Sequence, residues 1–419
     1  MTAAPWATRE LGFAVTDADA RPGRSVATLV EPGLRRNPRR AHLLVSPVLG
    51  KHIPARPDVV IGSADQLGAT VASVVGGPVD VLGMAETATG LGACVAARLD
   101  AEVYIHTTRR RTETDSYVEF EEGHSHATHH AVRPAPAHLF DADRPLVIVD
   151  DETSTGATAL AAIGELHRRN PRAHYVLASL VDMRTAEHLG EARRLARRLG
   201  TRIDAASLAA GRVMLPTGLI DAVHALPPPR LNAVAERRGE LRRLRHAWPP
   251  EVPDGGRHGF LRADADRFTA AVAEAADVVS RQLDNRRPVL VLGHEELMYL
   301  PLRLAGHLAA KSFSVKFQST TRSPAYVHDV DGYPLRRGYR FTPCEIDQTE
   351  PRYLYNGWPH DAGVPTQYVL VVDGAADTAG LAGPGGVEDV LTAAGHDLLT
   401  VVVAGADTAA LAAARDGRR

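Results

Sequence analysis

Leu146-Val147-Ile148-Val149-Asp150-Asp151-Glu152-Thr153-Ser154-Thr155-Gly156-Ala157-Thr158 is the stretch that decides the fold. Its first four residues are apolar and mostly β-branched, a pattern typical of a central strand in a parallel sheet that is covered on both faces. Sheets of this kind bind ligands at the carboxyl ends of their strands. The stretch therefore predicts a buried strand that leads into a binding turn.

The residues after the strand suit a phosphate and a sugar. From Glu152 to Thr158 the chain has small residues, several hydroxyls and one glycine, so backbone N–H groups can close around an anion. Ala159 to Ile163 continues as a helix, whose free N–H groups and dipole favour a phosphate at its start. Asp150 and Asp151 repel phosphate and suit ribose hydroxyls or a bound Mg²⁺. An acidic strand end that only caps a helix is the alternative interpretation.

The stretch resembles the phosphoribosyl pyrophosphate (PRPP) motif of type I phosphoribosyltransferases, in which an apolar strand is followed by two acids, a short spacer and a Thr-Gly-x-Thr turn. A Walker-type phosphate loop is excluded because no Gly-Lys-Ser/Thr ending is present. The resemblance implies an α/β fold with a type I phosphoribosyltransferase core, a parallel sheet with helices on both faces. It also implies that the motif binds PRPP through Asp150, Asp151, Glu152, Thr153, Ser154, Thr155, Gly156, Ala157 and Thr158.

Two earlier segments fit the same resemblance. Val79 to Gly83 has the pattern of a short strand, and a turn of small residues links it to a helix ending near Leu99. Such a turn lets main-chain N–H groups approach a ligand. In the family it is the pyrophosphate loop, and the resemblance assigns PRPP binding to Ala85, Glu86, Thr87, Ala88 and Thr89.

The strand predicted from Glu102 to Thr108 ends in Arg109-Arg110-Arg111. We expect these arginines to point toward the same mouth as the two acids, with a solvated turn as the alternative. The resemblance implies that Arg109 and Arg110 hold the pyrophosphate leaving group, and that they act in catalysis together with Asp150 and Asp151.

A long insertion, Thr112 to Arg144, separates these arginines from the motif. Connections of this length are usually functional or mobile, and its position matches the family's flexible loop, which closes over PRPP and excludes water. The insertion contains His124, His126 and His129. These histidines leave a zinc site open as an alternative, although no cysteine or second matched pair accompanies them.

Composition narrows the class of protein. At 419 residues the chain is long enough for two or three domains. Its 48 basic and 50 acidic residues give a net charge of -2, so the overall charge does not favour binding to nucleic acid or to a membrane. Two cysteines give no disulfide framework, and no apolar run suits a signal peptide or a membrane span. We expect a cytoplasmic protein without nucleic-acid or membrane partners.

We expect four segments: an N-terminal extension or hood over 1–56, a phosphoribosyltransferase domain over 57–225, a linker over 226–257 and a second α/β domain over 258–419. Arginines near a strand at Ala41 to Val45 suggest a solvated edge; alternatively, Lys51 or His52 reaches over the substrate site. The basic stretch Glu236 to His246 lies between prolines and reads as a helix-like, solvated spacer.

The C-terminal part repeats the pattern of the first domain. Val289 to Leu297 follows the same order as Val79 to Thr87: strand, Leu-Gly, two residues, then Glu. A later strand, Tyr368 to Asp373, echoes Leu146 to Asp150, but Gly374 stands where the second acid would be. This predicts a diverged α/β unit that does not bind PRPP in the same way; chance similarity is the alternative.

Thr320-Thr321-Arg322-Ser323-Pro324 resembles the signature of the TRSP domain, which follows an orotate phosphoribosyltransferase-like domain (PRTase_2) in bacterial tellurium-resistance and stress gene clusters. The family's proposed product is a nucleoside-like metabolite. Thr321, Arg322 and Ser323 form a candidate anion site because arginine offers a bidentate fork to phosphate or carboxylate. A proline-terminated strand edge is the alternative.

The resemblance implies a Mg²⁺-dependent pentosyltransferase that moves 5-phosphoribosyl from PRPP to a nitrogenous base or base-like acceptor and releases pyrophosphate. Asp150 and Asp151 are the candidate Mg²⁺ ligands. The family's habit makes a homodimer an expectation. A non-catalytic sensor of PRPP or a nucleotide is the alternative, and PRPP synthesis is a third reading for which we find no ATP site.

Overall fold

The motif strand lies in the middle of a seven-stranded sheet. The computed structural model describes residues 4–18, 24–110, 115–122, 128–345, 348–357 and 364–417. The sheet order is β1 (Ala14–Asp17), β10 (Arg202–Met214), β9 (His174–Asp182), β8 (Leu146–Thr153), β4 (Asp80–Gly83), β5 (Val103–His106) and β12 (Phe260–Leu261). The five central strands are parallel, and the two edge strands are antiparallel to their neighbours. The parallel core confirms the predicted fold class.

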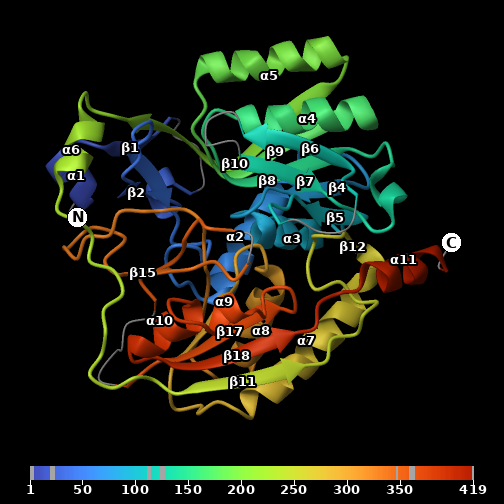
Figure 1. Cartoon of the computed structure of the whole chain (residues 1–419). Helices are drawn as coiled ribbons and strands as arrows, with labels where there is room; N and C mark the ends of the chain where they lie inside the picture. The colour runs from blue at the N-terminus through green and yellow to red at the C-terminus, as the bar shows by residue number, and fades with distance from the viewer. Residues whose placement is uncertain are drawn as a thin grey trace.

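Helices cover both faces of this sheet, as Figure 1 shows. α2 (Pro57–Ala72) and α3 (Thr89–Arg98) share one apolar cluster with Val147 and Val149 of β8. α4 (Ala157–Arg169) shares another with Leu146 and Ile148, and α5 (Ala186–Leu199) packs beside α4. Alternate residues of β8 therefore enter opposite faces, which explains why the strand is continuously apolar.

A second, wholly parallel sheet has the order β11 (Leu241–His246), β18 (Asp397–Val403), β17 (Gln367–Asp373), β13 (Val289–Gly293) and β14 (Val315–Ser319). The prediction of a helix-like spacer over Glu236 to His246 is thus wrong in its last part, because residues 241–246 form the edge strand β11. Arg242, Arg243 and Arg245 give it the charged face that protects an exposed sheet edge.

The second sheet repeats the first in its connections. The first domain runs α2, β4, α3, β5, the hairpin of β6 (Val118–Glu122) and β7 (Thr128–Val132), β8, α4, β9. The second runs α7 (Ala265–Ser280), β13, α8 (Tyr299–Ala310), β14, the hairpin of β15 (Gly338–Phe341) and β16 (Arg352–Tyr355), β17, α9 (Ala379–Ala382), α10 (Val387–Ala393), β18. Both sheets place the corresponding strands in the same order. The predicted repeat is confirmed.

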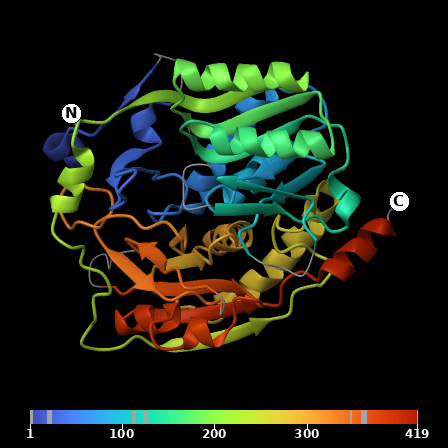
Figure 2. The ribbon, with the colours of Figure 1, turned by 45° about the horizontal axis from the view of Figure 1, so that its top comes forward.

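The two domains pack through the helices that follow their first strands. α8 packs against α2, α3 and α7, and one apolar cluster continues from the first sheet through these helices to the second. Figures 1 and 2 show the two sheets with these helices between them. At the start of α3, a Cβ on Gly90 would lie 3.1 Å from Cβ of Met298, so the close approach of the domains favours glycine there.

The N-terminal segment contacts both domains. α1 (Trp6–Leu11) places Trp6 5.6 Å from the ring of Tyr333, and the hairpin of β2 (Glu31–Leu34) and β3 (His42–Val45) follows. The remaining elements are η1 (Val26–Thr28), η2 (Ala137–Phe140), α6 (Leu219–Ala225), η3 (Arg262–Asp264) and α11 (Thr408–Asp416). Across the described ranges, every helix is too short or too polar to cross a bilayer.

Candidate functional site

The motif forms a strand, a tight loop and a helix at the carboxyl edge of the first sheet. β8 is longer than predicted and carries both acids as far as Thr153, and α4 begins at Ala157, two residues earlier than expected. Gly156 precedes the helix with φ +81°, a left-handed conformation that favours glycine. The first N–H groups of α4 have no partner within the helix and lie next to the loop.

The hydroxyls of the loop hold it in shape. Thr155 Oγ1 accepts a hydrogen bond from the Ala157 backbone N–H at 3.2 Å, and Thr153 Oγ1 donates to Ser179 Oγ at 2.9 Å. Residues 154–158 are only partly buried. A ligand can therefore reach the loop.

The acids before the loop carry unusual electrostatics. Burial, and then the negative charge of Asp151, raise the pKa of Asp150 well above its ordinary value. Burial also raises the pKa of Glu152, although Arg40 of the N-terminal segment lies 2.8 Å from it. Adjacent carboxyl groups that repel each other gain from hydroxyl donors or a cation. Their oxygens fit Mg²⁺, which prefers carboxylate ligands, and Asp150 and Asp151 would hold it.

The predicted pyrophosphate loop follows β4 and is buried throughout. Ala85 N–H donates to Thr107 Oγ1 at 2.8 Å, and the Ala85–Glu86 peptide bond is cis. Lys51 donates from Nζ to the Thr87 hydroxyl. Lys51 of the N-terminal segment therefore contacts the predicted loop.

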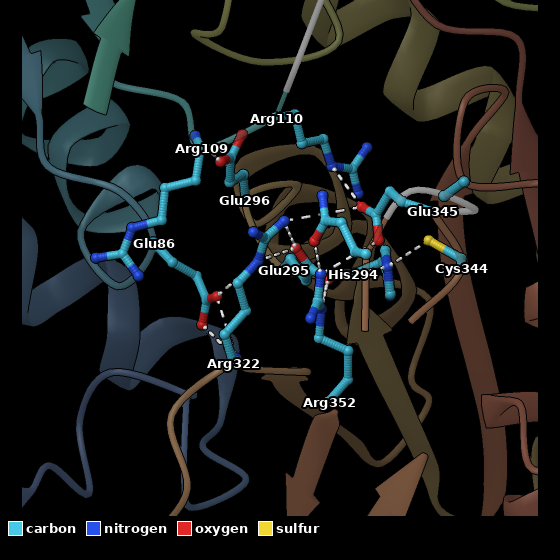
Figure 3. A network of polar contacts seen from close by, with 12 residues as sticks. Glu86, Arg109, Arg110, His294, Glu295, Glu296, Arg322, Cys344, Glu345 and Arg352 are labelled. Atoms are coloured by element: carbon cyan, nitrogen blue, oxygen red, sulfur yellow. Dashed lines mark hydrogen bonds and ion pairs between the residues drawn. The ribbon is translucent and has the colours of Figure 1, made fainter. Parts of the chain in front are cut away.

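The arginines after β5 diverge, as Figure 3 shows. Arg109 runs toward the side on which Glu86 lies, and its backbone N–H donates to Glu296 Oε1 at 2.6 Å. Arg110 turns into the second domain, where Nη1 donates to both oxygens of Asp373 at 2.9 and 2.7 Å. This corrects the expectation that Arg110 points toward the same site as Asp150 and Asp151. Its guanidinium instead pairs with a buried carboxylate of the other domain. Arg111 lies outside the described residues.

Corresponding loops of the two domains have the same internal hydrogen bonds. Glu295 N–H donates to Thr320 Oγ1 at 3.0 Å, as Ala85 N–H does to Thr107. Ser323 N–H donates to Thr321 Oγ1 at 3.0 Å, and Arg110 N–H donates to Thr108 Oγ1 at 3.1 Å. The duplication therefore extends to the geometry of the strand ends.

The contacts between the domains are reciprocal. Arg322 N–H donates to both oxygens of Glu86 at 3.2 Å. In return, Arg109 N–H donates to Glu296, and Thr108 Oγ1 donates to the same carboxylate at 2.7 Å. Glu86 and Glu296 occupy equivalent positions in the repeat, as do Arg109 and Arg322. Each domain thus binds the strand end of the other with an acid from its first loop.

Around these contacts lies a buried network that links the domains. Its five carboxylates and four guanidinium groups are joined by ion pairs, as Figure 3 shows in part: Glu86, Glu295, Glu296, Glu345 and Asp373, with Arg110, Arg257, Arg322 and Arg352. Burial opposes ionisation of Glu296, but the charges of Arg257 and other cations outweigh it and lower its pKa to about 2. Glu296 therefore stays charged although it is buried.

Thr321, Arg322 and Ser323 lie in this network. Thr321 bridges to Tyr353, and Arg322 Nε donates to Glu295 Oε2 at 2.7 Å. The anions that this turn holds are therefore carboxylates of the protein. Asp373, the counterpart of Asp150, is likewise paired with Arg110 and Arg257, so its carboxylate is already bound by arginines of the protein.

The insertion forms a hairpin where it is described, rather than an irregular loop. β6 and β7 pair, and Thr108 bridges to Ala131. His129 lies in β7 with Nε2 3.6 Å from Glu119, whereas His124 and His126 lie outside the described residues. Among the described histidines of this segment, His130 is buried and stacks on Phe120 with ring centroids 5.2 Å apart.

Several site residues were not predicted. Glu296, Asp373, Arg257 and Arg40 contact the loops and strand ends from distant parts of the chain. Glu296 and Asp373 had a signal, because they repeat the positions of Glu86 and Asp150. The contacts of Arg257 and Arg40 depend on how the segments dock.

Comparison with known proteins supports this description. Residues 29–212 match the family described as phosphoribosyl transferase, and residues 254–390 match the TRSP domain that lies C-terminal to it. No curated protein matches the chain.

Among solved structures, adenine phosphoribosyl transferase from Trypanosoma brucei, in complex with AMP, pyrophosphate and ribose-5-phosphate, has 15% identity, covers 43% of this chain and 76% of its own, and has a TM-score of 0.32. Adenine phosphoribosyltransferase from Rhodothermus marinus has 18% sequence identity to this chain and a TM-score of 0.33. The match covers 43% of this chain and 95% of the Rhodothermus chain. Orotate phosphoribosyltransferase from Aeropyrum pernix has 18% sequence identity to this chain and a TM-score of 0.27. The match covers 47% of this chain and 94% of the Aeropyrum chain.

Proposed function

Because the chain belongs to the family of phosphoribosyl transferases with a C-terminal TRSP domain, we propose that it is a Mg²⁺-dependent enzyme that transfers 5-phosphoribosyl from PRPP to a nitrogenous base or base-like acceptor and releases pyrophosphate. The observation that carries the proposal is the edge formed by β8, Gly156 and α4, where two acids precede an open anion loop. We place the product among nucleoside-like metabolites of a stress or tellurium-resistance system.

The phosphate and ribose of PRPP have separate places at this edge. Backbone N–H groups from Ser154 to Thr158 and the dipole of α4 bind the 5′-phosphate. Asp150 and Asp151 accept hydrogen bonds from the ribose hydroxyls. Mg²⁺, when bound, neutralises charge on the acids and on pyrophosphate.

The pyrophosphate end lies toward the loop from Ala85 to Thr89. Departure of pyrophosphate leaves an electron-poor, oxocarbenium-like ribose, so no nucleophilic side chain is required. Lys51 and Arg109 supply positive charge near the leaving group, and such pre-organised charge is usually the largest contribution to catalysis. Arg110 has no direct part, because its guanidinium pairs with Asp373.

The second domain serves this reaction as a scaffold. Arg322 holds Glu86 in the pyrophosphate loop, and Glu296 holds the backbone of Arg109. The loop from Ala85 to Thr89 follows β4, whereas Arg109 follows β5. Their relative position therefore depends on the second domain, which contacts both. A small misplacement of such groups can slow a reaction about a hundredfold.

A sensor of PRPP or a nucleotide is the second candidate. The same reciprocal contacts favour it, because a ligand that moves the loop from Ala85 to Thr89 must act on Arg322 and hence on the second domain. A sensor binds PRPP without turning it over.

The test is release of pyrophosphate from PRPP with Mg²⁺, measured across purines, pyrimidines and other nitrogen acceptors. We expect release that depends on one acceptor class, and a decrease of about a hundredfold or more in the Asp150→Asn/Asp151→Asn variant, since loss of one pre-organised contact costs roughly 3 kcal/mol. Glu165→Gln, on the exposed face of α4, is the control and keeps full activity. Binding without release for any acceptor contradicts the transferase and supports the sensor.

A further inference from the structure

We propose that the second domain contains a metal site of the zinc class, formed by His294, Cys344 and Glu345. These residues bring one ligand atom each to within 4.8 Å of one another. His294 directly follows β13, and Cys344 and Glu345 follow β15. The site lies apart from the PRPP motif and does not depend on the proposed transferase.

The three ligand types suit zinc. Imidazole nitrogen, thiolate sulfur and carboxylate oxygen are its usual protein ligands. Cys344 Sγ lies 3.2 Å from His294 Nε2, and the two residues are 2% and 1% exposed. A thiol that shares its proton with an imidazole at this distance can exchange that proton for a metal ion, which then bonds to both atoms and releases H⁺.

Neighbouring groups orient the ligands as in known metal sites. The other ring nitrogen of His294, Nδ1, lies 3.2 Å from Thr320 Oγ1, and such a hydrogen bond fixes the ring with Nε2 toward the metal. Arg352 Nη2 contacts Glu345 Oε2 at 3.3 Å, and Arg110 Nε lies 3.4 Å from Glu345 Oε1. Metal-binding carboxylates are commonly held by such outer contacts.

The charge of the buried network also favours a cation. Its five carboxylates face four guanidinium groups, and the thiolate of Cys344 adds a further negative charge. A divalent ion bound to the thiolate and to Glu345 offsets part of this negative charge. Burying an unbalanced charge is costly, so the ion stabilises the ionised thiol in this environment.

The repeat shows that the histidine ligand has no counterpart in the first domain. Met84 stands in the first domain where His294 stands in the second, and Ala85 stands where Glu295 does. The first loop thus has a methionine and an alanine where its copy has a histidine and a glutamate. Three protein ligands leave a fourth position open, as in catalytic zinc sites; Glu295 Oε1, 3.6 Å from His294 Nε2, is near enough to fill it.

The experiment is a titration of the chelator-treated full chain with Co²⁺, followed by its near-ultraviolet thiolate-to-cobalt band, and then displacement by Zn²⁺. The thiolate band is the specific readout, because nineteen histidines can bind zinc adventitiously. The chain has only one other cysteine, Cys94, which is buried in α3. We expect one equivalent of Co²⁺ to give the band in the wild type and in Cys94→Ser, and no band in Cys344→Ser.

Glu345→Gln provides a second test that does not remove the thiol. We expect it to keep the band and weaken Co²⁺ affinity by roughly 100-fold or more, since loss of a group outside the first shell already costs about 10- to 100-fold. Circular dichroism checks that each variant is folded. The proposal is overturned if neither wild type nor Cys94→Ser gives the band, or if the band depends on Cys94.

Discussion

Replacing Glu296 with glutamine tests whether the acid of the second domain locks the two domains together. Its carboxylate accepts hydrogen bonds from Arg109 N–H at 2.6 Å and Thr108 Oγ1 at 2.7 Å, and lies 3.5 Å from Arg257 Nε. The side chain is 1% exposed, so water cannot take over these contacts. Glutamine keeps the shape of the side chain and removes the charge.

The expected loss of stability follows from two lines of evidence. Hydrogen bonds to a charged group contribute about 1.5–3 kcal/mol each, against about 1 kcal/mol for neutral pairs. The pKa of Glu296, lowered from 4.5 to about 2, corresponds to about 3 kcal/mol of preference for the charged form. We therefore expect Glu296→Gln to lower the free energy of unfolding by about 3 kcal/mol.

Urea unfolding, followed by circular dichroism and tryptophan fluorescence, measures this loss. Glu165→Gln is the matched control, because Glu165 forms only an exposed pair with Arg168 and should change stability by less than about 0.5 kcal/mol. If Glu296→Gln is as stable as this control, the acid does not hold the domains and the reasoning is refuted.

Three further outcomes follow from the structure. Burial lowers the pKa of His106 to about 4 and of His130 to about 3, from 6.5. Below pH 6.5 these histidines bind protons in the unfolded chain but not in the folded chain, so the free energy of unfolding falls by about 1.4 kcal/mol per pH unit for each histidine. An unfolding free energy that is constant from pH 7 to about pH 5 contradicts this prediction. Gly156→Ala places alanine at φ +81° and should cost about 1 kcal/mol of stability and weaken PRPP binding in calorimetry; an unchanged affinity would argue against the loop. Lys51→Gln removes the contact to Thr87 and should raise the KM for PRPP about tenfold, whereas an unchanged KM separates Lys51 from the site.

Much of the fold was predictable because its signals are local. The apolar run of β8, the turn after it and the Leu-Gly repeat at Gly83 and Gly293 all lie within short windows of sequence, and the strands and helices follow them. Periodicity identifies such elements because one element buries one face. The weak alternation of 241–246 was mistaken for a spacer because an edge strand with exposed arginines resembles any charged segment.

The site was only partly predictable, because it depends on docking. The direction of Arg110 is set by Asp373, more than 260 residues further along the chain, and nothing near Arg110 in the sequence records it. Cys344 and His294 are likewise 50 residues apart and meet only through the fold. The acids and loop of the PRPP motif were predictable because one short segment holds them all.

Isothermal titration of the full chain with PRPP in the presence of Mg²⁺ tests the central claim, that the edge formed by β8, Gly156 and α4 is a PRPP site. We predict one PRPP bound per chain, affinity that falls by about a hundredfold in Asp150→Asn/Asp151→Asn, and unchanged affinity in Glu165→Gln. Equal binding by the acid variant and the wild type, or no binding by either, would contradict the claim.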